Sequence, residues 1–349
     1  MVLSRLLNII SVLLMIGVFG LTVFAFFLNH WINKPLSFSE EAIIKIQPGD
    51  TLGKISYQLA KDGILSQPKL LIFYAKFTDR TKIEVGEYNI PQFITPENLL
   101  DLLQSGDVVT YSVTLVEGKT FKNFLNVLQQ QTNLDSTLED KTPNEIIELN
   151  GLTIDHPEGW FYPDTYQYVS GTSDNDILMR AYTKMEKVLA EEWSQRSKDL
   201  PYKNAYEALI MASIIEKETG VASERSEIAG VFVRRLKKGM RLQTDPTIIY
   251  GLGDSYKGNI RRKHLTQATP YNTYVIDGLP PTPIAMPGRE AIHAALHPAE
   301  GTTLFFVAKG DGSHQFSTTL DEHNKAVQEY QIKNRAKQYR SAPEKSKND

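Results

Sequence analysis

A long apolar stretch near the amino terminus constrains the fold of this chain more than any other feature. The segment LLNIISVLLMIGVFGLTVFAFFLN carries no charged side chain between Arg5 and His30. As a helix rising ~1.5 Å per residue, residues 6–28 can cross the ~30 Å hydrocarbon core of a bilayer. We therefore expect a transmembrane helix over residues 6–28, preceded by a short cytoplasmic end at residues 1–5.

A cleaved signal peptide is the alternative interpretation of this stretch. It predicts a shorter apolar region followed by an A-x-A-like cleavage site, whereas FFLNHWINK follows here. Trp31 and Lys34 are typical of residues that anchor a helix at the membrane interface. Arg5 lies on one side of the stretch, and Lys34, soon followed by Glu40 and Glu41, lies on the other. This charge difference favours a cytoplasmic amino terminus and an exported remainder.

Composition places the rest of the chain among ordinary globular proteins. The sequence has 349 residues, of which 41% are hydrophobic and 23% charged, enough to build an anchor and two or three packed modules. A net charge of −3 and the absence of a basic, aromatic-interleaved stripe argue against a nucleic-acid partner. The sequence contains no cysteine, which excludes a disulfide scaffold, a thiol nucleophile and a cysteine-ligated zinc site.

Strand and helix patterns mix along the chain and predict an α+β fold in several parts. We expect a linker at 29–40, a small α+β module at 41–110, a connecting α+β region at 111–157, a larger mixed domain at 158–335 and a disordered tail at 336–349.

The small module begins with the phrase PGDTL, which resembles the start of a LysM module, a peptidoglycan-binding fold. The simpler interpretation is a Pro-Gly-Asp turn in which Asp50 or Thr51 caps the next helix.

Apolar residues at helical spacing predict several helices in the larger domain. Helices are expected at 174–198, from Ala205, at 223–238, at 289–296 and at 321–339, with a hairpin in TLFFVAKGDGSHQFS. The segments after Gly239, including RLQTDPTIIYGLG, predict mainly extended chain with turns.

The helix that begins at Ala205 is apolar on nearly every side and then ends in two acids. At 100° per residue, Glu218 shares a face with Met211 and Ile214, whereas Glu216 lies about 200° away from Glu218. The two acids therefore do not form a pair on one face. Partial burial and the negative end of the helix dipole both raise a carboxyl pKa, which suits a general acid. The simpler interpretation is a solvated acid, or one paired with a neighbouring cation.

A series of unusual phrases follows in one order along the larger domain. They are EGWFYPDTY, ASIIEKETG followed by SER, GMRLQTDPTIIYG, TPYNTY, GLPPTPIAMPG, HPA, FFVAKGDGSHQFS and EHN. Together they closely resemble the YceG-like family of endolytic murein (lytic) transglycosylases, from the anchor to about Tyr330, with the LysM-like module in the expected place.

The resemblance implies an enzyme of the bacterial inner membrane with an exported, periplasmic catalytic domain. Such enzymes cut nascent glycan strands of peptidoglycan internally, which ends strand elongation. They cleave the β-1,4 bond between N-acetylmuramic acid and N-acetylglucosamine without water and leave a 1,6-anhydromuramoyl end. The catalytic glutamate of the family falls on Glu218. The family context also suggests peptidoglycan synthases as partners, and no cofactor.

Several further residues are candidates for supporting roles. Directional donors and acceptors for sugar hydroxyl and acetamido groups are expected from Gln243, Asp245, Tyr271, Asn272 and Thr273. Glu224 is expected either to orient a partner residue or to cap the helix that begins near Ser223. The aromatic residues Trp160 and Tyr162 are expected to pack in the core rather than to stack on sugar. No metal site is expected, because His297, His314 and His323 lack metal-ligand spacing.

Two other functions are compatible with these residues. One is a non-catalytic wall-binding scaffold that recruits synthases through the LysM-like module, and the other is a hydrolytic muramidase that uses the same site. The complete EKET phrase argues against the scaffold, and the chemistry of the released ends distinguishes all three functions.

Overall fold

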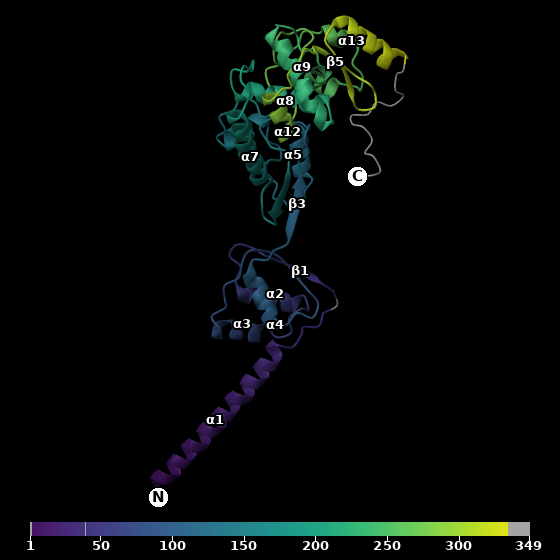
Figure 1. The fold of residues 1–349 in the computed structure, drawn as a ribbon. Helices are drawn as coiled ribbons and strands as arrows, with labels where there is room; N and C mark the ends of the chain where they lie inside the picture. Colours follow the sequence, from purple (N-terminus) through teal and green to yellow (C-terminus); the bar gives the residue numbers. More distant parts are fainter. Residues whose placement is uncertain (1, 39, 334–349) are drawn as a thin grey trace. The chain divides into compact units, whose positions relative to one another are not determined.

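The computed structural model describes residues 2–38 and 40–333 and divides the chain into two compact units. Unit 1 comprises Met1–Tyr111 and Tyr168–Gly171, and unit 2 comprises Ser112–Gln167 and Thr172–Asp349. Both contain helices and strands (Figure 1), which confirms the predicted α+β class. The predicted disordered tail, residues 336–349, lies outside the described residues.

Unit 1 opens with the helix α1 (Val2–Ile32), which contains the predicted apolar stretch. Its segment Ser4–Ile32 is long and apolar enough to cross a membrane, and most side chains along it are exposed. Only the end of the helix enters a core, where Ile32 is buried with Leu36 and Ile44. The helix is therefore apolar without being a core helix of a globular domain.

A two-stranded antiparallel sheet and three helices form the rest of unit 1. Strand β1 (Ala42–Ile46) pairs with β2 (Gly86–Ile90), and α2 (Leu52–Lys61), α3 (Pro68–Phe77) and α4 (Pro96–Ser105) pack with them.

Threonine side chains cap two of these helices, and Thr51 is one of the two caps that the sequence offers for α2. The Thr51 hydroxyl accepts a hydrogen bond from the Lys54 amide at the start of α2, and Thr95 caps α4 in the same way. Asp50 instead accepts from the Gln47 amide and pairs with the Lys54 ammonium, so it closes the turn rather than capping the helix.

The chain passes between the units along β3 (Thr110–Thr114) and β4 (Thr165–Val169), which form a second sheet. Strand β3 ends before Gly118, which adopts a φ of +72° and whose amide donates to the Met286 carbonyl. Two short helices follow, α5 (Phe121–Gln129) and α6 (Pro143–Leu149), each with a threonine capping box.

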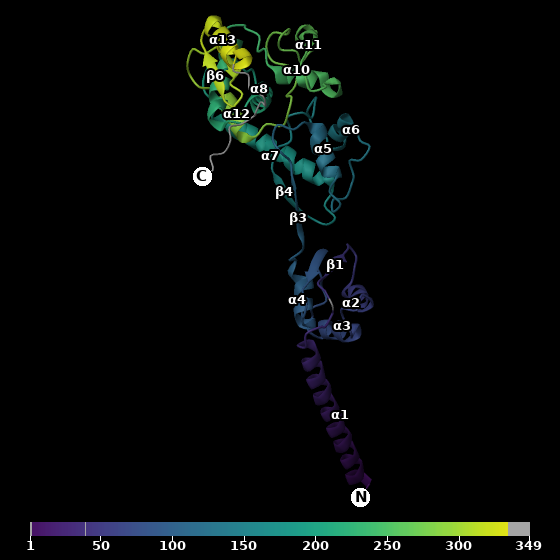
Figure 2. The same ribbon diagram turned by 90° about the vertical axis from the view of Figure 1, so that its right-hand side faces the viewer.

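Unit 2 is built around α8 (Ala205–Glu218), with every residue from Ala208 to Ile215 buried. The helices α7 (Asp174–Ser194), α9 (Arg225–Lys237) and α12 (Arg289–Leu296) pack around it (Figures 1 and 2). An apolar helix needs this arrangement, because burial on all sides is what removes its side chains from water. The single polar residue on the buried stretch, Ser213, is satisfied: its hydroxyl donates to the Ile210 carbonyl and accepts from the Ile284 amide.

The aromatic phrase that begins at Glu158 packs in this core, as expected. The Trp160 ring stacks on Tyr206 with centroids 5.6 Å apart, and Phe161 is fully buried. Gly159 permits the close packing, because a Cβ built on it would lie 2.5 Å from the Pro283 side chain. The phrase therefore fixes the GLPPTPIAMPG loop against α8.

The segment after Gly239 departs from the prediction of mainly extended chain. Residues Asp245–Leu252 form the helix α10, and Arg262–Thr266 form the short helix α11. The β-branched residues in TDPTIIYG favour an extended interpretation, but Pro246 occupies the first turn of α10, where a missing N–H costs nothing. Packing beside α8 decides between the two conformations.

The carboxyl-terminal part of unit 2 follows the prediction more closely. Strands β5 (Phe305–Ala308) and β6 (His314–Ser317) form the expected hairpin, and α13 (Leu320–Val327) continues into a wider helical turn at Gln328–Lys333. Two short helical turns, Ala222–Glu224 and Gly253–Ser255, complete the described elements of unit 2.

Candidate active site

Glu218 is the last residue of α8, and its partly buried side chain lines a pocket of about 580 Å³ in unit 2. The helix ends there because Thr219 adopts an extended conformation (φ −143°, ψ 137°). The buried body of α8 thus delivers one carboxyl group to the edge of the core. Pocket-lining groups from α9, α10 and the β5–β6 hairpin surround it.

The environment of Glu218 favours its protonated form. Burial is the largest influence and raises the pKa of the carboxyl to about 7. The charge of the neighbouring Asp245 also raises the pKa, whereas a hydrogen bond from the Thr244 hydroxyl to Oε1 of Glu218 lowers it. An acid with a pKa near neutrality can give up a proton and take one back, which is the property a general acid and base requires.

Two of the predicted sugar-binding residues lie in the same pocket. Gln243 and Asp245 line it together with Glu218, and the Tyr274 hydroxyl donates to Asp245 Oδ1 over 2.8 Å. Gln243 has a φ of +53°, an unusual value for a residue with a side chain. The backbone N–H of Gln243 donates a hydrogen bond to the Thr273 carbonyl oxygen at 3.1 Å, so the surrounding structure fixes this conformation.

The other three predicted sugar-binding residues are not among those that line this pocket, and they hold neighbouring segments of unit 2 in place. Asn272 is buried, and its amide group donates to three backbone carbonyls of the segment 264–267. Thr273 is also buried and accepts from the Thr244 amide at 3.0 Å. The Tyr271 hydroxyl bonds the Thr282 hydroxyl at 2.9 Å. Of the three, Thr273 positions Thr244, the hydrogen-bond donor to Glu218.

The Glu224 carboxylate contacts His314 and makes no side-chain cap on α9. It precedes α9, but its carboxylate faces the β6 strand instead of the helix amides. One oxygen accepts from the His314 amide at 2.9 Å, and the other lies 2.8 Å from His314 Nδ1. His314 lines the pocket, so Glu224 ties the hairpin that forms part of its wall to the end of α8.

Several residues of the pocket were not predicted from the sequence. Thr244, Tyr274 and His323 line it, and the Nδ1 atom of His323 is buried without a hydrogen-bond partner among the described residues. Arg235 also lines it, with its guanidinium bonded to backbone carbonyls, among them that of Leu304 at 2.7 Å. Thr244 lies between two predicted site residues, and this proximity is the signal that could have identified it.

Glu216 lies elsewhere, as the helical spacing predicts. Its carboxylate accepts the amide of Gly288 at 3.0 Å, directly before the first residue of α12. A negative charge at a helix amino terminus is favourable, although burial raises the pKa of this group too. Glu216 therefore joins α8 to α12, and it is not among the residues that line the Glu218 pocket.

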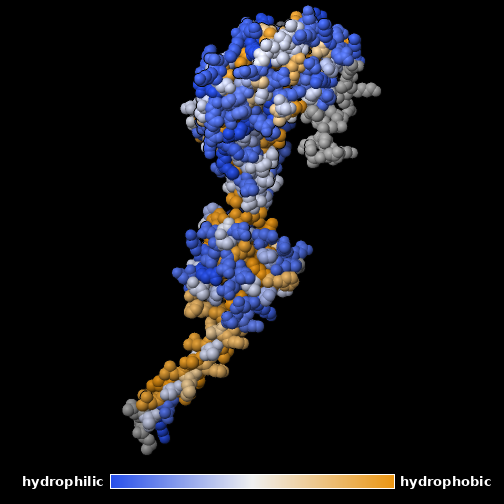
Figure 3. Space-filling view, in the orientation of Figure 1, coloured by the Kyte–Doolittle hydropathy of each residue, from blue (hydrophilic) through white to orange (hydrophobic). Residues whose placement is uncertain are grey.

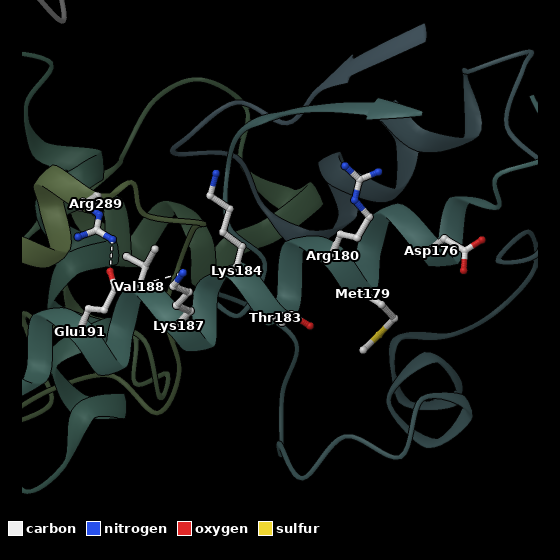
Figure 4. Close-up of a pocket in the computed structure, with 9 residues that line it drawn as sticks. All are labelled: Asp176, Met179, Arg180, Thr183, Lys184, Lys187, Val188, Glu191 and Arg289. Carbon is white, nitrogen blue, oxygen red and sulfur yellow. Dashed lines mark hydrogen bonds and ion pairs between the residues drawn. The ribbon is translucent and has the colours of Figure 1, made fainter. Parts of the chain in front are cut away.

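A second hollow, of about 880 Å³, runs along α7 (Figure 4). Its cations are already engaged: Lys184 pairs with Asp164, Lys187 with Glu191, and Arg289 with Glu191. The hollow lacks a carboxyl group with the protonation behaviour of Glu218, so it is the weaker candidate for an active site.

One group among the described residues has the composition of a metal site. Ligand atoms of Glu192, His293 and His297 lie within 4.8 Å of one another. However, one Glu192 oxygen accepts from Arg289 at 2.8 Å, and the other lies 2.8 Å from His293 Nδ1. The carboxylate is therefore already satisfied within the protein, and the expectation of no metal remains a prediction.

Comparisons with known proteins identify the family of this chain. The profile described as the YceG-like family matches residues 44–329. A Bacillus subtilis (strain 168) protein named endolytic murein transglycosylase is 31% identical over 307 residues, which cover 82% of this chain and 84% of that protein. A Streptococcus pneumoniae protein (serotype 2, strain D39) of the same name is 28% identical over 323 residues; the match covers 82% of this chain but 58% of the longer relative.

A solved structure is similar as well. The crystal structure of a yceG-like protein from Listeria monocytogenes matches with a TM-score of 0.53 and 30% identity, over 82% of this chain and 98% of that one. A profile that covers most of the chain, together with this similarity in sequence and fold, establishes the relationship. The chain belongs to the YceG-like family.

Proposed function

We propose that the protein is an endolytic murein transglycosylase that cuts the glycan strands of peptidoglycan. Family membership and the shared name of its relatives support the activity. The observation that carries the assignment to a site is the placement of Glu218, an acid with a pKa of about 7, in a pocket at the end of a buried helix.

In this proposal Glu218 serves first as the general acid. Its protonated carboxyl donates to the oxygen of the bond between N-acetylmuramic acid and N-acetylglucosamine while the bond breaks through an oxocarbenium-like state. The carboxylate that results then accepts the proton of the C6 hydroxyl of the same muramic acid, and that oxygen attacks C1. The product is a 1,6-anhydromuramoyl end, and Glu218 recovers its proton.

An intramolecular nucleophile explains why one carboxyl group is sufficient. The C6 hydroxyl belongs to the ring that it attacks, so its effective concentration is high and no second enzymic nucleophile is required. The residues proposed to bind sugar are Gln243 and Asp245, with Tyr274 beside them, because they offer directional donors and acceptors in the pocket. Tyr271, Asn272 and Thr273 are proposed to act through the loops that they hold.

The presence of Asp245 beside Glu218 also favours one alternative. A hydrolytic muramidase uses two carboxyl groups, and Asp245 is a second carboxyl in the same pocket. In our proposal Asp245 instead keeps the pKa of Glu218 high and binds substrate. The identity of the new chain ends separates these functions.

The remaining parts receive roles that follow from this activity. We propose that α1 anchors the protein in the bacterial inner membrane with the bulk of the chain on the periplasmic side, that the module at 41–110 is LysM-like and binds the wall, and that 158–335 is the catalytic domain. The PGDTL turn before α2 supports the second assignment. Synthases that extend the strands are the partners we propose.

Product analysis tests the proposal directly. Purified full-length protein is incubated with isolated glycan strands, and the released muropeptides are identified by mass spectrometry. We expect 1,6-anhydromuramoyl ends from the parent protein, and a loss on the order of 10²–10⁴ in rate for Glu218→Gln. Glu216→Gln is the matched control on the same helix and should keep cutting.

Each other outcome has a distinct meaning. Reducing ends on the products would show that the protein is a hydrolase. Strands that remain intact would favour the non-catalytic scaffold. Cutting that persists in Glu218→Gln but disappears in Glu216→Gln would move the catalytic role to the other acid.

A further inference from the structure

The helix α3 has two contrasting sides. Leu71 and Ala75 are fully buried in the core of unit 1, while the phenyl rings of Phe73 and Phe77 stack against each other on the other side, with centroids 6.3 Å apart. The exposed fractions are 45% for Phe73 and 78% for Phe77. Large aromatic side chains exposed side by side usually mark a surface that meets something other than water.

Two cations share this exposed side. At 100° per residue, Lys69 and Lys76 fall within about 100° of the two phenylalanines, and both lysines are exposed. We call the four residues the outer face of α3. Aromatic rings interleaved with lysines are typical of helices that lie in a membrane interface, where the rings enter the acyl boundary and the ammonium groups reach the headgroups.

Contact with α1 fixes the depth of the outer face of α3 along the proposed membrane span. The Phe73 ring packs edge-on against Phe24 of α1, with centroids 5.6 Å apart. Phe24 lies four residues inside residue 28, where the predicted span ends, which is about 6 Å at 1.5 Å per residue. The end of α1 is also packed against the rest of unit 1, because Ile32 is buried in the core of this unit.

We propose that the outer face of α3 inserts into the bilayer beside α1, so that unit 1 rests on the membrane surface. The inference depends on the proposed membrane span of α1. A side chain that touches Phe24 is brought to the depth of Phe24 when α1 crosses the membrane, and hydrocarbon at that depth accommodates phenyl rings. Figure 3 shows the apolar surface of α1 continuing onto the adjoining edge of unit 1. Lys69 and Lys76 would then face anionic headgroups.

Depth measurements on the full-length protein test this inference. Because the sequence has no cysteine, a single cysteine places one fluorescent label at a chosen site. Three variants are required: Phe77→Cys on the outer face, Phe19→Cys within the span, and Ile43→Cys on β1. Ile43 is the matched control, since it is also apolar and 65% exposed, on a strand at the end of unit 1 away from α1 (Figures 1 and 2). Each protein is reconstituted into vesicles of phosphatidylcholine and phosphatidylglycerol that carry a nitroxide quencher on the acyl chain.

We expect the labels at 77 and 19 to be quenched several-fold more strongly than the label at 43, independently of the ratio of protein to lipid. Quenching at 19 without quenching at 77 overturns the inference and leaves the span of α1 intact. Absence of quenching at both 77 and 19 would show that α1 does not span the membrane, and it would overturn the inference as well. If quenching of the label at position 77 decreases as the ratio of protein to lipid rises, the label is covered by another copy of the chain. That result also overturns insertion into lipid.

Discussion

At the residue scale, the ionisation of Glu218 is set by opposing neighbours. Burial and the charge of Asp245 raise its pKa, and the hydroxyl of Thr244 lowers it by stabilising the carboxylate. A general acid must be protonated when substrate binds, so the balance among these groups sets the pH at which activity declines. The influences of Asp245 and Thr244 each belong to one side chain and can be removed separately.

Replacement of the two neighbours should move the pH dependence in opposite directions. Since kcat/KM falls as pH rises through the pKa of the acid in the free enzyme, about 7, Asp245→Asn should shift this decline to lower pH, because it removes a charge that raises the pKa. Thr244→Val should shift it to higher pH, because it removes a hydrogen bond to the carboxylate. Rate profiles between pH 5 and pH 9 measure both shifts. Equal shifts in one direction would show that Glu218 is not the group that titrates.

The same elevated pKa predicts a stability cost. In the unfolded chain the Glu218 carboxyl loses its proton above about pH 4.5, whereas in the folded protein it keeps the proton until about pH 7. The free energy of unfolding therefore declines as pH rises between these values. Glu218→Gln does not titrate and should be more stable than the parent by up to about 3 kcal/mol above pH 7, with no such gain below pH 4.5. Urea unfolding at pH 4.5 and pH 8 compares the two proteins. A gain that is equal at both pH values would contradict the proposed cause.

At the element scale, the β5–β6 hairpin depends on a side chain from another segment for its place in the pocket wall. Glu224, directly before α9, accepts the amide of His314 and faces its ring nitrogen. Hydrogen bonds to a charged group contribute about 1.5–3 kcal/mol each, which is large for a four-residue strand. The connection joins the end of α8 to the far part of the site.

Loss of this connection should affect binding more than proton transfer. In Glu224→Ala we expect faster hydrogen exchange at residues 314–317 and a roughly tenfold higher strand concentration for half-maximal rate, equivalent to about 1.4 kcal/mol. The pH profile should stay in place, because Glu224 is not among the groups that shift the pKa of Glu218. Unchanged exchange in β6, or a displaced profile, would show a different role.

At the scale of the whole molecule, α1 belongs both to the proposed membrane anchor and to the folded part of unit 1. Most of the helix is exposed and apolar, but Ile32 is buried with Leu36, whose amide donates to the Ile94 carbonyl at 2.8 Å. The boundary between anchor and module therefore lies within the last residues of the helix.

Two truncations should behave differently for this reason. Removal of residues 1–29 should release a soluble protein in which unit 1 remains folded, since Ile32 and Leu36 stay in the core. Removal of residues 1–36 should destabilise unit 1 by about 2–5 kcal/mol, because two large buried side chains are lost. Thermal unfolding followed by circular dichroism compares them. Similar unfolding of both proteins would place the boundary after Leu36.

Several features of the protein could be predicted from the sequence because they depend on local interactions. The apolar helix, the cap at Thr51 and the separation of Glu216 from Glu218 all follow from helix geometry or from side chains within a few residues. The choice of Glu218 for catalysis came from the resemblance to a family and remains a proposal.

Only the tertiary structure decided which distant residues meet. It brought Gln243 and Asp245 into the Glu218 pocket and buried Asn272 and Thr273 outside the pocket lining, although all four occur in phrases of similar composition. It also made a helix of Asp245–Leu252, where local propensity favours an extended chain. The physical reason is the same in each case: periodicity reports the face of one element, whereas burial, charge and hydrogen bonds at a site come from elements that are distant in sequence.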